Sequence, residues 1–101
     1  MYDKEIEINY FDFFDDWRRD DIIYNGKNIV IYYKIVVLHN IPVLVWKIEG
    51  LEDFEFRADY HLILPKTKDL SKYFYDAIEF FLKNPDYDNE LFDSLRMFLG
   101  L

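Results

Sequence analysis

The sequence contains no cysteine, only three glycines and three prolines, and no apolar run that could span a bilayer. Without cysteine, a disulfide framework, a thiolate-bound zinc and a thiol nucleophile are excluded, which fits a reducing compartment. Three scattered glycines cannot build a glycine-rich phosphate loop. The longest apolar stretch, residues 29–38, is interrupted by Lys34 and is far shorter than the ~20 residues of a membrane-spanning helix.

The first residues also lack the basic and apolar regions of a signal peptide. We therefore expect a cytoplasmic protein, in the host cytoplasm if its origin is viral. The chain has 101 residues, of which 51% are hydrophobic and 21% aromatic. This is enough material for one core, so residues 1–101 are expected to form a single domain.

The net charge of −8 is distributed unevenly along the chain. Residues 1–21 carry −5, residues 22–48 carry +3 and contain no acid, and residues 49–101 carry −6. Such a field repels phosphate backbones and anionic membranes, so direct binding of nucleic acid or membrane is not expected. A basic protein is the partner that this charge favours.

The centre of the chain has the pattern of a sheet. Asn25-Gly26 between two apolar runs predicts a two-residue hairpin turn, which needs positive φ at both positions. The β-branched and aromatic run 29–38 indicates a strand, residues 39–42 a turn, and residues 43–49 a further strand.

Residues 54–64 alternate strictly, which indicates a half-buried strand with one wet face. The residues expected to point inward are Phe54, Phe56, Ala58, Tyr60, Leu62 and Leu64. Those expected to point outward are Glu55, Arg57, Asp59 and His61.

After Pro65 the apolar period becomes helical and predicts two helices. The stripe of the first comprises Leu70, Tyr73, Phe74, Ala77, Ile78 and Phe81, and Asn84-Pro85 ends it. The second is capped by Asp86 or Asp88, turns Leu91, Leu95 and Phe98 inward, and closes at Gly100.

For the N-terminal part, Ile6, Tyr10, Phe13 and Trp17 share one helical face, although residues 5–8 alternate like a strand. We predict a helix from about Tyr10 to Asp20. The expected fold is α+β: an antiparallel four-stranded β-meander with an N-terminal helix and two C-terminal helices packed mainly on one face.

Catalytic groups are sparse, and we expect no enzymatic activity and no cofactor. Outside tyrosine, the hydroxyl candidates are Thr67, Ser71 and Ser94, each in or beside a predicted helix, while His39 and His61 fall in a turn and on a polar strand face. No nucleophile, base and orienting group are brought together by this pattern. Residues 86–90 begin like a calcium loop, but Leu91 and Met97 replace its sixth-position glycine and twelfth-position glutamate, so no metal site is expected.

Acidic surfaces are what remains as candidate partner-binding sites. Acids at helical spacing stand about 5–6 Å apart, and such a row can imitate phosphates. The first cluster is Asp12, Asp15, Asp16, Asp20 and Asp21, the second is Glu52, Asp53 and Glu55, and the third is Asp86, Asp88, Glu90 and Asp93. The alternative for each is a solvated surface that keeps the protein soluble.

The sheet face away from the helices is expected to be partly apolar and partly charged, as in many interaction surfaces. Either N-terminal residues cover it or it binds a partner, a second copy of the chain included. Lys34 and Lys47 are expected to lie opposite acids of neighbouring strands, namely Glu49, Glu55 and Asp59.

In size, acidity and lack of catalytic groups, the chain is similar to small phage-encoded inhibitors of bacterial defence enzymes, such as anti-CRISPR and anti-restriction proteins. It also resembles immunity proteins that neutralise nuclease toxins. No motif assigns residue roles from either class. The resemblance implies an inhibitor of a basic nucleic-acid-processing enzyme, which acts by protein–protein contact as a DNA mimic. The alternatives are an immunity protein, a carboxylate-based enzyme or metal-binding domain, and a structural or oligomerisation module.

Overall fold

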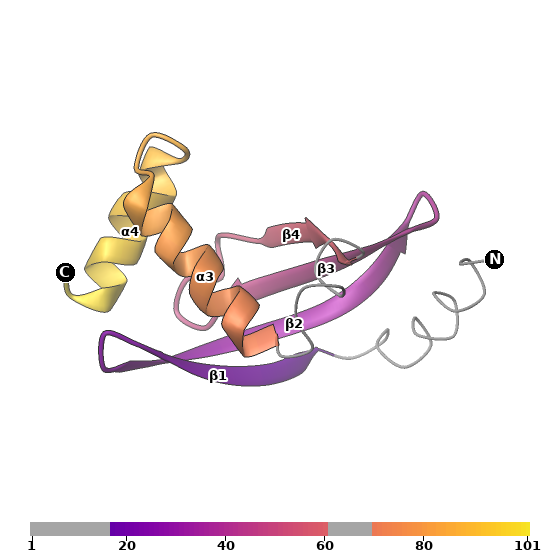
Figure 1. The fold of residues 1–101 in the computed structure, drawn as a ribbon, viewed down its shortest axis with the longest axis horizontal. Coiled ribbons are helices and arrows are strands. Elements are labelled where there is room, and N and C mark those ends of the chain that lie inside the picture. Colours follow the sequence, from indigo (N-terminus) through magenta and orange to yellow (C-terminus); the bar gives the residue numbers. More distant parts are fainter. Residues whose placement is uncertain (1–16, 61–69) are drawn as a thin grey trace.

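A computed structural model of the chain describes residues 17–60 and 70–101. They form a four-stranded antiparallel sheet in the order β1-β2-β3-β4, followed by two helices (Figure 1). This confirms the α+β class, the meander and the two C-terminal helices. The elements are β1 (Arg18–Tyr24), β2 (Lys27–Leu38), β3 (Ile41–Ile48), β4 (Phe56–Asp59), α3 (Leu70–Lys83) and α4 (Asn89–Leu99).

The predicted helix over residues 10–20 is wrong at its C-terminal end, because Arg18, Arg19 and Asp20 belong to β1. Its residues 10–16 lie outside the described part. The twelve-residue β2 is long enough to pair with all seven residues of β1, from Arg18 opposite Tyr33 onwards. Tertiary pairing therefore overrides the local helical pattern.

Two tight turns connect the first three strands. Asn25 and Gly26 have φ values of 51° and 77°, as expected for the predicted hairpin turn. His39 and Asn40 also have positive φ, 52° and 63°, and join paired strands directly. For this reason β3 begins two residues earlier than predicted, at Ile41.

The predicted strand over residues 54–64 is shorter in the structure. Only Phe56–Asp59 pair with β3, while Phe54 precedes the strand and residues 61–64 lie outside the described part. The expected alternation is nevertheless present around β4, since Phe56 and Tyr60 are buried and Arg57 is exposed.

Both helices cover the same face of the sheet, which α3 crosses obliquely (Figure 1). Phe74 and Ile78 of α3 are fully buried, as is Leu95 of α4. The sheet contributes the alternate residues Ile29, Ile31, Ile35, Leu44, Trp46 and Ile48. The remaining residues of the predicted α3 stripe pack against this core, which confirms the helical pattern.

The caps of α4 also follow the sequence. Of the two predicted N-cap candidates, Asp88 accepts a hydrogen bond from the Leu91 backbone N–H. Gly100 closes the helix in the left-handed conformation. Neither α3 nor α4, the helices of the described part, is long and apolar enough to cross a membrane.

Gly50, in the turn after β3, allows α4 to approach the sheet closely. Its φ is +95°, and a Cβ there would lie 2.8 Å from Cε1 of Phe98. The Lys27 ammonium lies 4.7 Å from the centroid of the same ring and donates a hydrogen bond of 2.6 Å to the backbone carbonyl of Phe98. The turn after β3 and the end of α4 are therefore packed as one unit.

We expect Gly50→Ala to lower the free energy of unfolding by about 2–3 kcal/mol, because a strained φ and a clash with Phe98 add together. The matched control is Gly26→Ala, at φ +77° with nothing within 4 Å. It should cost only about 1–2 kcal/mol, the conformational part. Urea unfolding measures both variants, and equal losses would contradict the close contact with Phe98.

Candidate functional site

The first acidic cluster does not form one row in the part of the chain that the structure describes. Asp12, Asp15 and Asp16 lie outside it, and Asp20 and Asp21 are consecutive strand residues, which point to opposite sheet faces. The helical row proposed for Asp20 is therefore wrong.

Both carboxylates on β1 are engaged within the chain. Asp20 accepts a hydrogen bond of 2.6 Å from the Ser71 hydroxyl, which joins β1 to α3. Asp21 lies 3.0 Å from the Arg19 guanidinium. The hydrogen bond from Arg19 lowers the pKa of Asp21 below its usual value.

The second cluster lies in the connection between β3 and β4. Glu52 accepts a hydrogen bond of 2.9 Å from the Gly50 backbone N–H, which lowers the pKa of the Glu52 carboxyl. Glu55 receives two hydrogen bonds from Arg57, so its charge is balanced locally. Asp53 is exposed.

The third cluster surrounds the start of α4. Asp86, Asp88, Glu90 and Asp93 are all exposed, and none of them forms an ion pair with another described residue. Asp88 uses one oxygen, Oδ1, as the helix cap. Among residues 17–60 and 70–101, no three histidines or acids are gathered closely enough to hold a metal ion.

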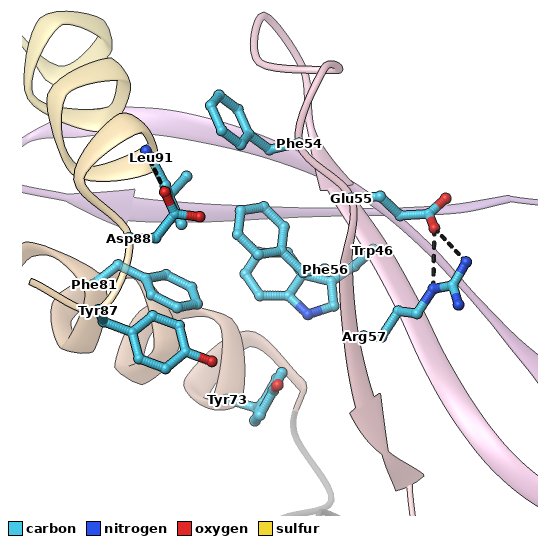
Figure 2. A pocket seen from close by; sticks show the side chains of 10 residues that line it. All are labelled: Trp46, Phe54, Glu55, Phe56, Arg57, Tyr73, Phe81, Tyr87, Asp88 and Leu91. Atoms are coloured by element: carbon cyan, nitrogen blue, oxygen red, sulfur yellow. Dashed lines mark hydrogen bonds and ion pairs between the residues drawn. The ribbon is translucent and has the colours of Figure 1, made fainter.

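A cavity of about 220 Å³ lies between the β4 side of the sheet and the corner where α3 meets α4 (Figure 2). Glu55 of the second cluster and Asp88 of the third both line it. The structure thus brings together two clusters that are about thirty residues apart in the sequence. The remaining lining residues are Trp46, Phe54, Phe56, Arg57, Tyr73, Phe81, Tyr87 and Leu91.

The walls of this cavity are aromatic rings in mutual contact. Phe56 stacks on Trp46 with ring centroids 4.2 Å apart and on Phe81 at 5.4 Å, and Tyr87 lies 5.7 Å from Phe81. Trp46 is 1% exposed, whereas Tyr87 is 68% exposed. The series of rings therefore runs from the core to the surface. From the sequence, Phe56 and Phe81 were expected in the core, and Tyr87 had no role beyond its place in the 86–90 segment. Its position directly after the helix-ending Asn-Pro could have indicated an aromatic residue at the surface.

One buried donor in the cavity wall, Trp46 Nε1, makes no hydrogen bond of standard geometry with a described residue. Burial of the Tyr73 hydroxyl raises the pKa of Tyr73. A weaker hydrogen-bonding interaction with Trp46 opposes this rise, so the Tyr73 hydroxyl is the polar group beside the indole N–H.

The other sheet face carries an aromatic residue between two lysines. Lys34 and Lys47 place their ammonium groups 4.6 and 4.3 Å from the centroid of the Trp17 ring. The expected acidic neighbour of Lys34 is wrong, because the register puts Val45 opposite it. For Lys47, the β2 neighbour is Tyr32, and the pairing of β3 with β4 ends one residue earlier, at Trp46 opposite Phe56.

This face has the expected mixture of apolar and charged side chains. Val45 is only 5% exposed although it lies outside the main core cluster. The hydroxyl of Tyr32 donates a hydrogen bond of 2.9 Å to Glu49. Trp17, Tyr32, Lys47 and Glu52 line a shallow hollow here.

Comparison of the chain with protein-family models, with curated proteins and with solved structures gives no match.

Tyr73 provides a test of the packing around the cavity. Because burial raises its pKa, the unfolded chain loses this proton at a lower pH than the folded one. The stability that Tyr73 contributes is complete below about pH 10 and is lost as the pH rises through the raised value.

We therefore expect the free energy of unfolding of Tyr73→Phe to fall less steeply above about pH 10 than that of the wild type. Around neutral pH, the difference in free energy of unfolding between the two proteins should stay constant. Urea unfolding at about pH 8 and about pH 11 measures this. Parallel pH profiles of variant and wild type would contradict the burial of the hydroxyl.

Proposed function

We propose that the protein is a small acidic binding protein without enzymatic activity, which docks onto a basic nucleic-acid-processing enzyme and blocks it. It would act in the manner of phage anti-defence inhibitors. The docking surface is the acidic edge, which we define as Glu52, Asp53, Glu55, Asp86, Asp88, Glu90 and Asp93. Two of its members, Glu55 and Asp88, line the aromatic cavity.

The observation that carries this proposal is the unpaired charge at the start of α4. Its four acids are exposed and have no ion-pair partner among the described residues. In contrast, the acids of α3 are balanced: Asp76 lies 3.0 Å from Lys72, and Glu79 lies 3.4 Å from Lys83. Uncompensated charge on one edge attracts a positive surface and orients it.

The exposed aromatic residues beside these acids support docking rather than solubility alone. Phe80 is 47% exposed and its ring contacts that of Tyr87 at 5.4 Å. Aromatic side chains are enriched at the centre of protein interfaces, and a polar rim surrounds this centre. An edge that served only as a solvated surface would not need such rings.

Asp20 and Asp21, the two acids of the first cluster that lie on β1, are weaker candidates for partner contacts in the structure than they were in the sequence. Asp20 is tied to Ser71 and Asp21 to Arg19. Both carboxylates would have to give up these bonds to contact a partner.

The test requires a target, which a tagged pull-down from bacterial lysate with elution by increasing salt would supply. We then expect Glu90→Gln/Asp93→Asn to slow association with the purified target about threefold to tenfold at low salt. The matched control is Asp76→Asn/Glu79→Gln, which removes the same charge from α3 and should have a smaller effect. Stopped-flow or biolayer measurements at several salt concentrations give the rates.

Duplex DNA should compete with the protein for the target if the carboxylates occupy a phosphate-binding groove. Equal rates for the two variants would exclude the acidic edge as the contact. A target that is neither basic nor nucleic-acid-processing would overturn the proposed class, and a nuclease toxin would make the protein an immunity protein.

A further inference from the structure

Building on the proposed function, we propose that the aromatic cavity is the anchor point of the interface and receives an arginine side chain of the basic partner. The guanidinium would lie over the rings at the cavity mouth and face Asp88. The acidic edge explains attraction of a basic partner, and the arginine site gives the aromatic lining of the cavity a role in binding it.

The rings supply the first requirement, free aromatic faces. In the part of the chain that the structure describes, cations of the chain lie over the rings of Trp17, Phe92 and Phe98, and none lies over a ring of the cavity. The rings of Phe81 and Tyr87 sit near the surface, in contact with each other. A planar and weakly hydrated guanidinium stacks on such rings more readily than a compact ammonium does.

Asp88 supplies the second requirement, a carboxylate with remaining hydrogen-bonding capacity. Its Oδ1 accepts from the Leu91 N–H, and Figure 2 shows the side chain on the α4 side of the cavity. A carboxylate has about four acceptor positions. The helix cap and an incoming guanidinium can therefore share Asp88.

Arg57 explains why the chain does not fill its own cavity. Arg57 lines the cavity, yet two hydrogen bonds from its Nε and Nη2 to Glu55 hold its guanidinium at the β4 side, away from the rings (Figure 2). The Glu55 charge also offsets that of Arg57, which would otherwise repel a second cation. Glu55 thus keeps the cavity open.

Trp46 supplies a reporter for the cavity. Its indole lines the cavity and stacks on Phe56 with ring centroids 4.2 Å apart. A cation bound over the neighbouring rings therefore changes the environment of this indole. The same indole is a direct reporter, because its N–H gives a resolved signal in a nitrogen–proton spectrum.

The test is a titration of the whole chain with N-acetyl-arginine N-methylamide, followed by the indole N–H signals of the two tryptophans. Trp17→Phe assigns the signals. We expect a saturable shift of the Trp46 signal and none of comparable size at Trp17. The uncharged norleucine analogue should bind at least tenfold more weakly, because it lacks the cation.

Two pairs of variants locate the site. Asp88→Asn keeps a good helix cap and should weaken binding of the probe about fivefold, whereas Asp93→Asn on the same helix should not. Arg57→Gln should strengthen binding, because it removes a positive charge and leaves the Glu55 carboxylate beside the cavity without its partner, and Arg96→Gln should not.

An unmoved Trp46 signal, or equal binding by Asp88→Asn and Asp93→Asn, would overturn the arginine site. If Glu90→Gln/Asp93→Asn still slowed association with the target, the proposed docking function would stand without the arginine site. If the probe bound as expected but the target proved not to be basic, the arginine site would stand and the proposed function would fail.

Discussion

The packing of Trp46 determines how the sheet and the helices fit together. This indole, from the middle of β3, stacks on Phe56 of β4 and contacts Phe74 of α3 at a centroid distance of 5.0 Å. It is almost completely buried, so its shape sets the spacing between the two layers. The aromatic cavity is lined by the rings that continue from Trp46 toward the surface, through Phe56 and Phe81 to Tyr87.

Local sequence patterns were sufficient to predict those features that are determined by residues close together in the chain. The Asn25-Gly26 turn, the helix stop at Asn84-Pro85 and the Asp88 cap depend on backbone preferences of a few residues, and all three are present. The alternation around β4 and the stripe of α3 follow from one-sided burial. These features needed no knowledge of distant contacts.

The errors arose where a distant partner decides. Arg18–Asp20 have a plausible helical pattern, but the length of β2 makes them a strand. Lys34 was assigned an acidic neighbour, but register cannot be read from composition, and a shift of one residue changes every cross-strand pair. The cavity could not be foreseen for the same reason: its lining comes from β3, β4 and both helices, and only the packed arrangement shows which ring faces remain free.

The order of elements along the chain has a consequence for how the protein folds during synthesis. The hairpins of β1, β2 and β3 are local and can form early, but among the described elements the helices that cover their apolar face, α3 and α4, follow the sheet in the chain. The hydrogen bond between Lys27 and Phe98 joins residues 71 positions apart, so α4 can dock only after nearly all of the described chain has left the ribosome. A nascent chain would expose a sheet of isoleucine, leucine and tryptophan until that moment, and it is then that a chaperone would be needed most.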